Sequence, residues 1–542
     1  MKKIVAFILC FQLMMSLFTF LPTGVFAGED TGVCGDDLTW EFNAETGALT
    51  IFGTGKMYNY YPSISDAGSN ITTAPWGIYC DSIKTVEITS GVESVGNYAF
   101  YWCTALENVT VPDSLTSISF AAFTGCSSLK CNDYDNAEYL GNTSNPYVAL
   151  IKTTDSSVKS CKINDNTKII GSNAFADCAQ LWEIEIPDSV IGIGGGAFSN
   201  CNKLSEISLS NSITSIEDDT FVNCSNLACV TIPEGVVTIG NRAFSGCTSL
   251  YDVTIPDGVE EIKNEAFYNC FNLIAAVMPD SVTKLGQNAF KGCRGLLSVE
   301  LSNNLGSIED GTFYDCRSLS GVTIPNGVTQ IGWGAFACCT DLKQVLIHDS
   351  ITRILGGVFD ESSLTDIYYS GTEEQWGNVI IFPNDKLPEV TIHYNTDIID
   401  HVWDDGIVLK AETCVKRGIM KYTCTVCGEI KAQIIPAPGH SYSDEYTIEV
   451  EPTETTVGYK ARHCTICSNP GYFIMIPKIG TVMGDSNGDG RVDMRDVLLM
   501  RKHILNIIKL TGNAFPAADM DENGMINMKD VLAVRKKILN IH

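Results

Sequence analysis

The 542-residue chain has few basic residues, few histidines and few long apolar segments. It contains 36 Lys and Arg against 64 Asp and Glu, which gives a formal net charge of −28. Nucleic-acid binding depends on cations that neutralise phosphates, so this balance argues against a nucleic-acid partner and against adsorption to an anionic membrane surface. The seven histidines share no catalytic frame. These shortages disfavour nucleic-acid binding and histidine-dependent catalysis.

Only the N-terminus carries a long apolar run. Lys2 and Lys3 precede the run IVAFILCFQLMMSLFTFL, and the segment closes with VFA. A basic start, an apolar centre and a small-residue exit are typical of a secretory signal peptide, which we expect over residues 1–27. A membrane anchor is the alternative, and the polar Gln12 and Ser16 disfavour it. No later run is long enough to span a bilayer, so we expect an exported, extracellular protein.

The centre of the chain repeats every 23 residues. Eleven phenylalanines recur in register from Phe100 to Phe359, each preceded five residues earlier by an aliphatic residue. In ten of the eleven units a cysteine follows the phenylalanine by three residues, and in ten a leucine follows by six. Such self-similarity indicates an array of like units. The spacing from Phe123 to Phe175 is 52, so one unit carries an insertion around 130–160.

A single unit cannot fold alone. It offers four or five large apolar side chains, each worth about 1.5–3 kcal/mol on burial. Ordering each of its backbone residues costs about 1–2 kcal/mol. Neighbouring units must therefore cover one another, which gives a solenoid. Alternating residues such as Val253 and Ile255 predict one short parallel strand in each coil, with turns between strands.

The repeat cysteines have three interpretations: metal ligands, disulfide partners or buried core. Stacked coils lie about 4.8 Å apart and present parallel side chains, whereas a disulfide needs converging Cβ atoms. Free cysteine also behaves as a small buried hydrophobe. Although 22 cysteines in an exported chain would ordinarily indicate disulfides, we predict that the repeat cysteines pack in the core.

The register of these units resembles the BspA-like bacterial family of leucine-rich repeats. The resemblance implies a β-rich solenoid over residues 83–365, preceded by an N-terminal cap (28–82) and followed by a C-terminal cap (366–397). The cap assignments rest on VCGDDLTWEFNAETGALTIFGTGKMYNY and SGTEEQWGNVIIFPNDKLPEVTIHYN. Members of this family are typically surface or secreted proteins used for binding and adhesion. The resemblance therefore implies a surface that recognises a protein or a glycan.

Residues 401–478 hold two similar segments of about 40 residues, which we expect to form small β-modules. Each contains a C-x-x-C pair, Cys424 with Cys427 and Cys464 with Cys467. Two such pairs have the spacing for one structural zinc ion with four thiolates. A disulfide within each pair is the alternative, which an exported location favours. Further candidate ligands are Cys414, His401 and His463.

Two acidic loops near the C-terminus have the pattern of calcium-binding loops. DSNGDGRVDMRD (485–496) and DMDENGMINMKD (519–530) place oxygen-bearing side chains at positions 1, 3, 5, 9 and 12, and glycine at position 6. Calcium takes several oxygen ligands at about 2.3–2.6 Å, including the backbone carbonyl of position 7. The following segments, VLLMRKHILNI and VLAVRKKILNI, are predicted helices identical at eight of eleven positions. We predict two Ca²⁺ ions, with ligands Asp485, Asn487, Asp489, Arg491, Asp493 and Asp496 for one and Asp519, Asp521, Asn523, Met525, Asn527 and Asp530 for the other.

This duplication resembles a type I dockerin over residues 485–542, joined by a linker at 479–484. No helix leads into the first loop, and position 12 is Asp where ordinary EF-hands use Glu. The resemblance implies folding on calcium and attachment to a cohesin on a cellulosome-type scaffold. Many dockerins carry hydroxyl residues where this chain has Met-Arg and Met-Lys. The resemblance therefore does not define which type of cohesin is bound. The family's recognition positions fall on Met494, Arg495, Arg501 and Lys502, and on their duplicates Met528, Lys529, Arg535 and Lys536. The near-identity of the two sets implies that either can dock after a half-turn.

Three functional classes follow from these features. We expect a noncatalytic binding protein whose solenoid is delivered to a scaffold by the dockerin. The alternatives are a structural spacer, or an enzyme of polysaccharide degradation, since many dockerin-bearing proteins are glycoside hydrolases. Repeats, caps and modules account for every long segment, so no room is left for a catalytic domain and we predict no enzyme activity.

Overall fold

The computed structural model describes residues 29–64, 70–382, 387–396, 401–414, 417–426, 428–471, 473–489, 491–505, 507–511 and 513–539. The chain divides into two units, Met1–Asp405 with Tyr422–Ala432, and Gly406–Lys421 with Gln433–His542. The predicted signal peptide lies outside the described residues. Within the described part of the chain, no helix combines the length and apolar character needed to cross a membrane.

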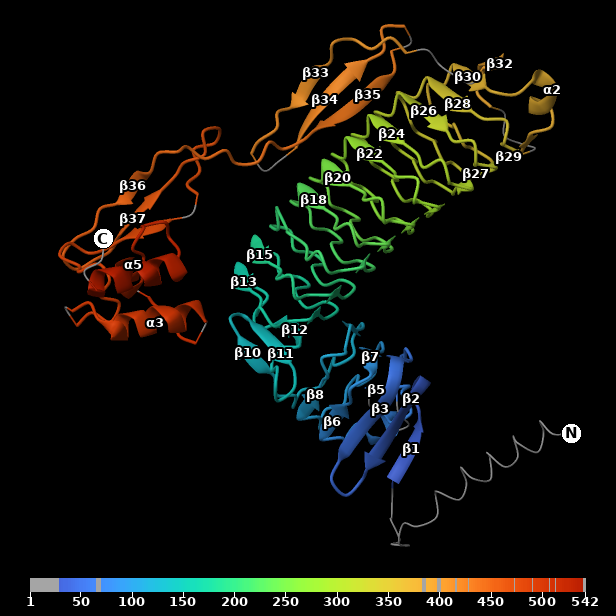
Figure 1. Cartoon of the computed structure of the whole chain (residues 1–542). Helices are drawn as coiled ribbons and strands as arrows, with labels where there is room; N and C mark the ends of the chain where they lie inside the picture. The colour runs from blue at the N-terminus through green and yellow to red at the C-terminus, as the bar shows by residue number, and fades with distance from the viewer. Residues whose placement is uncertain are drawn as a thin grey trace, which may run out of the picture. The chain divides into compact units, whose positions relative to one another are not determined.

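An antiparallel sheet begins the first unit and continues into the repeats (Figure 1). Its three strands are β1 (Glu29–Val33), β2 (Gly35–Asn43) and β3 (Ala48–Met57). Strand β3 pairs in parallel with both strands of the first coil, β6 (Thr85–Ile88) and β7 (Val92–Val95). A short hairpin, β4 (Pro62–Ile64) with β5 (Asn70–Thr72), and the 3-10 helix η1 (Gly77–Tyr79) follow β3 in the chain. The long strand thus covers the end of the solenoid.

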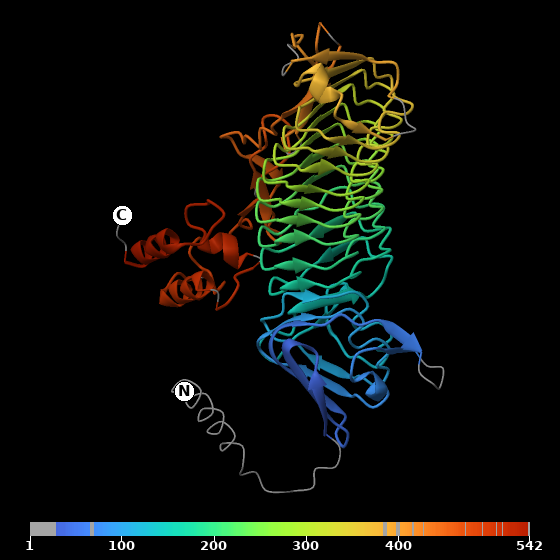
Figure 2. The same cartoon turned by 90° about the vertical axis from the view of Figure 1, so that its right-hand side faces the viewer.

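The coils stack as two rows of short parallel strands (Figure 2). In most coils paired residues are 23 apart, as in Val230 with Val253 and Ile239 with Ile262. Strands of the first row after β6 are β8 (Asn108–Thr110), β13 (Ser160–Lys162), β15 (Glu183–Glu185), β18 (Cys229–Thr231), β20 (Asp252–Thr254), β22 (Ala275–Val277), β24 (Ser298–Glu300), β26 (Gly321–Ile324), β28 (Gln344–Ile347), β30 (Asp366–Tyr369) and β32 (Thr391–Tyr394). Strands of the second row after β7 are β9 (Ser117–Ile118), β14 (Ile169–Ile170), β16 (Gly192–Ile193), β17 (Ser215–Ile216), β19 (Thr238–Ile239), β21 (Glu261–Ile262), β23 (Lys284–Leu285), β25 (Ser307–Ile308), β27 (Gln330–Ile331), β29 (Arg353–Ile354) and β31 (Ile380–Ile381). The predicted solenoid is confirmed, with two strands in most coils rather than one.

The repeated phenylalanines form a stacked column inside the solenoid. From Phe175 to Phe359, neighbouring ring centroids lie 5.0–5.9 Å apart and the ring planes differ by at most 14°. Trp76 extends the first part of the column, stacking on Phe100 at 5.5 Å. Because every coil places its phenylalanine at the equivalent position, each ring is covered by the rings of the neighbouring coils, and its burial depends on both of them.

The repeat cysteines lie beside this column, and most donate a hydrogen bond. The Cys201 thiol, for example, donates to the backbone carbonyl of Phe175, one coil earlier, at 3.1 Å. Seven other cysteines make the same bond to the preceding coil at 3.1–3.3 Å: Cys126, Cys224, Cys247, Cys270, Cys293, Cys316 and Cys339. Core packing is confirmed, since nine of the ten are fully buried and Cys126 is half-buried against the core. Nine of the ten are also free thiols. The exclusion of disulfides is wrong for Cys103, which is buried in the core but is bonded to Cys80, because these two side chains converge at the first coil.

Each coil also contains two residues with left-handed backbone. One lies two positions before the phenylalanine and the other lies two positions after it. This region favours Gly, Asn and Asp because other side chains are strained there. The later position is filled by Trp102, Gly125, Asp177, Asn200, Asn223, Gly246, Asn269, Gly292, Asp315, Cys338 and Glu361, all with φ between 56° and 83°. This later position is the residue directly before the repeat cysteine, and its left-handed backbone explains why Asn, Asp or Gly so often occurs there.

The insertion around 130–160 interrupts the phenylalanine column. It forms the antiparallel strands β10 (Asn132–Tyr134), β11 (Ala137–Leu140) and β12 (Ala149–Thr153), and β12 then pairs in parallel with β14. Phe123 packs against one hydrophobic core cluster, and Phe175 belongs to the next. The core of the solenoid is therefore divided at this point.

The last coils are closed by β30, β31, β32 and the short helix α2 (Glu373–Trp376). Thr372 caps this helix, and Trp376 is buried edge-on against Tyr369 with ring centroids 4.9 Å apart. Later in the chain, the described residues form two three-stranded sheets and three helices. The sheets contain β33 (Ile407–Lys410), β34 (Gly418–Thr423) and β35 (Ile430–Ile435), and β36 (Thr447–Val450), β37 (Gly458–Ala461) and β38 (Ile474–Ile476). The helices are α3 (Met494–Ile504), α4 (Ala514–Ala518) and α5 (Met528–Leu539).

Candidate metal sites and docking surface

The first acidic loop holds its two terminal carboxylates in place with backbone N–H groups. Asp485 accepts a hydrogen bond from the N–H of Gly488 at 2.7 Å. Asp496 is fully buried and accepts from the N–H of Asn487 at 3.1 Å and of Asp493 at 2.8 Å. Asp493 and Asp496 also form the capping box of α3, so the end of the loop and the start of the helix are one structure.

The second loop repeats this arrangement. Asp519 accepts from the N–H of Gly524 at 2.7 Å, and Asp530 accepts from the N–H of Asn527 at 2.9 Å. Gly524 has φ +85°, which is why this position of the loop requires glycine. Its counterpart Gly490 lies outside the described residues. The side chains of Asn487, Asp489, Arg491, Asp521, Asn523 and Met525 are exposed, and those of Asp493 and Asn527 are half-buried.

The second loop gathers negative charge in a way that fits a hard cation. Asp519, Asp521 and Asp530 each offer an oxygen within 4.8 Å of the others, and two of the three are buried. Burial, together with the carboxyls of Asp530 and Asp521, raises the pKa of Asp519 above its usual value. Oxygen ligands of this kind suit Ca²⁺, which also offsets the repulsion among them. The residues present therefore fit the cation that the sequence pattern predicts.

Arg495 distinguishes the first loop from the second. Its guanidinium contacts Asp489 at 2.8 Å and Asp493 at 2.7 Å, two predicted calcium ligands. These contacts lower the pKa of Asp493. The equivalent residues of the second loop are Lys529 with the uncharged Asn523 and Asn527. The predicted ligand side chains of the first loop thus include four carboxylates, against three in the second, and Arg495 offsets part of their charge.

Helices α3 and α5 pack together through equivalent residues. Val497 and Met500 of α3 are buried with Val531 and Val534 of α5, and each pair is 34 residues apart in the chain. The duplication seen in the sequence is therefore also a structural duplication, in which both helices turn the same side inward.

The outward sides of the two helices carry matching stripes. We call Met494, Leu498, Arg501 and Leu505 the α3 stripe, and Met528, Leu532, Arg535 and Leu539 the α5 stripe. Exposed fractions of the apolar members are 55, 53 and 69% in the α3 stripe and 56, 54 and 63% in the α5 stripe. Seven of the eight predicted cohesin contacts are exposed, and Lys502 is half-buried. Sequence reasoning missed the four leucines, which helical spacing from the two methionines indicates.

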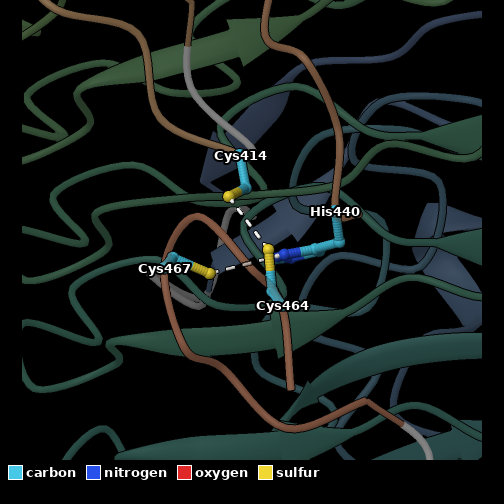
Figure 3. A group of neighbouring side chains, drawn as sticks. All are labelled: Cys414, His440, Cys464 and Cys467. Carbon is cyan, nitrogen blue, oxygen red and sulfur yellow. Dashed lines mark hydrogen bonds between the residues drawn. The ribbon is translucent and has the colours of Figure 1, made fainter. Parts of the chain in front are cut away.

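Four side chains from the two cysteine modules converge in the second unit (Figure 3). Cys414 comes from the loop after β33, His440 precedes β36, and Cys464 and Cys467 follow β37. The Sγ atoms of Cys414 and Cys464 are 3.5 Å apart, and the Cys467 Sγ is 3.5 Å from His440 Nδ1. The pKa of the Cys464 thiol is lowered to about 5, mainly because its thiolate accepts a hydrogen bond from the backbone N–H of Cys467. Burial raises the pKa of Cys414 to about 12.

This cluster differs from the set of ligands expected from the C-x-x-C spacing. Cys464 and Cys467 are members, but Cys424 is not, and Cys427 lies outside the described residues. His401 and His463 lie elsewhere, beside Glu429 and Glu449 at 3.5 and 3.3 Å. His440 opens the second module in the sequence, and that position was its only signal as a candidate ligand.

The solenoid has a hollow of about 710 Å³, lined by the coils that come before and after the insertion in the chain. Hydroxyl and amide groups dominate its walls, which include Asn59, Asn97, Ser119, Asn173 and Ser215. Phe120 also lines the hollow, is 46% exposed and packs edge-on against Tyr98. The site combines polar, mostly uncharged side chains with one accessible aromatic ring.

Solved structures similar to this chain are bacterial leucine-rich proteins. A cell surface protein from Faecalibacterium prausnitzii is 26% identical, with 65% of this chain and 98% of that chain covered and a TM-score of 0.32. A leucine-rich repeat protein from Bacteroides ovatus is 22% identical, with 67% and 99% covered and a TM-score of 0.36. One from Eubacterium ventriosum is 22% identical, with 62% and 90% covered and a TM-score of 0.33. No curated protein matches the chain.

Two family profiles match the sequence. The type I dockerin domain matches residues 483–539. The BspA type leucine-rich repeat region matches in six copies, over residues 78–144, 153–274 and 260–388, which is more than half of the chain. Both are binding or structural modules, and neither is a catalytic domain. The chain therefore belongs to the BspA type leucine-rich repeat family, and it carries a type I dockerin domain at its C-terminal end.

Proposed function

We propose that this protein is a secreted, noncatalytic binding protein. Its solenoid, which we assign to residues 83–365 between caps at 28–82 and 366–397, presents a recognition surface. The dockerin attaches that surface to a cohesin on a cellulosome-type scaffold, with Ca²⁺ bound in both loops.

The pair of matching stripes is the observation that carries the docking proposal. Leucine and methionine side chains that are more than half exposed are costly to leave in water, and such groups mark interaction surfaces. Arg501 and Arg535 add one cationic group in the middle of each stripe. Because both loops hold the first turn of their helix through its capping residues, loss of calcium is expected to disturb the stripe that follows. Cohesin binding is therefore expected to depend on calcium.

The hollow in the solenoid favours a glycan over a protein as its ligand. Its volume is in the range of small-ligand sites, which hold ligands through a few placed polar groups. Amide and hydroxyl groups match the hydroxyls of a sugar, and an exposed ring such as Phe120 offers a flat apolar face. Binding of a soluble oligosaccharide that weakens in Phe120→Ala, with Phe382→Ala as a matched exposed control, supports this assignment. Binding that is equal in both variants overturns it.

Calcium-dependent capture tests the docking proposal. The mature chain, immobilised in calcium, should retain a type I cohesin module, and the double change Asp485→Ala with Asp519→Ala should abolish retention. Glu522→Gln is the matched control, since Glu522 is an acidic residue of the second loop outside the predicted ligand positions. Retention that is unchanged in chelator, or unchanged in the double variant, refutes calcium-dependent docking.

An assay for released reducing sugar separates the proposal from an enzymatic role. Incubation of the mature chain with plant polysaccharides should release none above a buffer control. Release that follows the purified chain through chromatography would establish the enzymatic alternative. A solenoid that binds no glycan and no protein would leave the structural spacer as its role.

A further inference from the structure

The four-residue cluster of Figure 3 has the dimensions of a tetrahedral metal site. In a zinc site with Zn–S bonds of about 2.3 Å and Zn–N bonds of about 2.05 Å, two sulfurs lie about 3.8 Å apart and a sulfur and a nitrogen about 3.6 Å. The distances from Cys414 to Cys464 and from Cys467 to His440 are both 3.5 Å. All four ligand atoms lie within 4.8 Å of one another.

We propose that Cys414, His440, Cys464 and Cys467 bind one structural Zn²⁺ ion. Three thiolates and one imidazole are a common ligand set for structural zinc. The ion occupies the centre of the four atoms and displaces the protons that the thiols still hold. Because Cys414 belongs to the first cysteine module and the other three to the second, the metal joins the two modules.

The local backbone around Cys464 is shaped for a metal ligand. The N–H of Ser468 donates to the Cys464 carbonyl at 2.9 Å, and Ser468 has φ +60°, so the chain turns tightly around the sulfur. Thr465 ties this turn to Ser441, next to His440, with an N–H to carbonyl bond of 2.8 Å. The turn therefore positions two thiols and the imidazole together before the metal arrives.

Comparison of the two modules explains why a cysteine of the first module completes the site. When Gly418 and Gly458 are aligned, the second module has Glu454 where the first has Cys414. The second module thus supplies two cysteines and His440, one ligand short of four, since its other histidine, His463, lies beside Glu449. Cys414 provides the missing ligand.

A disulfide accounts for the cluster less well than zinc does. Three cysteines cannot all be paired, so any disulfide among them leaves one thiol and leaves His440 without a role. A disulfide also requires sulfurs about 2.05 Å apart, whereas zinc uses all four groups close to their present distances.

Elemental analysis of the full mature chain tests the proposal. The protein, saturated with calcium so that the dockerin loops are filled, should contain about one zinc per chain. Cys464→Ser and His440→Gln should each reduce zinc affinity by more than about tenfold, since loss of even an outer-shell partner costs about 10–100-fold. Cobalt added to the metal-free wild type should show the visible absorption of a tetrahedral thiolate site.

Cys424→Ser is the matched control, because Cys424 is also a buried cysteine of a C-x-x-C turn but lies outside the cluster. It should retain zinc. Loss of zinc in this variant would overturn the proposal by placing the metal in the first module. So would a disulfide among Cys414, Cys464 and Cys467 in protein alkylated without reductant. Calcium-dependent cohesin capture by each variant shows that it is folded, so that zinc loss reports the site itself.

Discussion

Disabling one docking stripe at a time tests whether the two are equivalent. Leu498→Asp places a charge in the centre of the α3 stripe, and Leu532→Asp does the same in the α5 stripe. Both leucines are more than half exposed, so neither change should unfold the free protein. Each single variant should still bind a cohesin through its other stripe, whereas the double variant should not.

The size of the effect follows from the equivalence of the stripes. If both bind with the same affinity, removing one halves the number of binding modes, which is about 0.4 kcal/mol or a twofold rise in Kd. Removing both places a charge where an apolar anchor docks, and truncation of such anchors typically costs about 2 kcal/mol or more. The double variant should therefore bind at least about thirtyfold more weakly.

Isothermal titration of a type I cohesin module into the full chain, with calcium present, measures both effects and the stoichiometry. Ile479→Asp serves as the control, since Ile479 is equally exposed but lies in the linker. One cohesin per chain is expected for the wild type and both single variants, because the two modes exclude each other. A tenfold loss in one single variant would refute equivalence, and unchanged binding in the double variant would refute docking through either stripe.

Three further predictions concern the core and the calcium loops. Phe267→Ala removes a fully buried ring that stacks on rings in both neighbouring coils, and should destabilise the solenoid by about 3–5 kcal/mol in chemical denaturation; a change near zero would contradict the column as a source of stability. Because the pKa of Asp519 is raised, its carboxyl stays protonated to higher pH in the folded protein than in the unfolded chain. The free energy of unfolding of the calcium-free dockerin should therefore fall as pH rises from the ordinary carboxyl range through that raised pKa. Asp519→Asn should flatten this dependence in chelator, and a slope that is unchanged would show that another group is responsible. Arg495→Ala should raise calcium affinity by less than about tenfold, because the ion pairs it removes are exposed; calcium titration should show the effect in this variant and not in Lys529→Ala.

Several features were determined by the sequence alone because they depend on contacts between identical or adjacent positions. A strict 23-residue register places each phenylalanine on the next, so the column follows from the period itself. The predicted ligands of each acidic loop lie within one short stretch of the chain, so their spacing alone was enough to predict a calcium site. The repeat cysteines were also correctly predicted as core residues, and nine of the ten are free thiols as expected.

Other features were decided only by the tertiary structure, because they depend on which distant segments meet. Periodicity did not distinguish Cys103 from the other repeat cysteines, although Cys80 lies against it at the first coil. The C-x-x-C spacing grouped four cysteines by their similarity, whereas among the described residues the fold brings Cys414 and His440 to Cys464 and Cys467. Local spacing specifies a site when its ligands share one turn of chain. When they come from separate loops, the packing of the modules selects among cysteines that are alike in sequence.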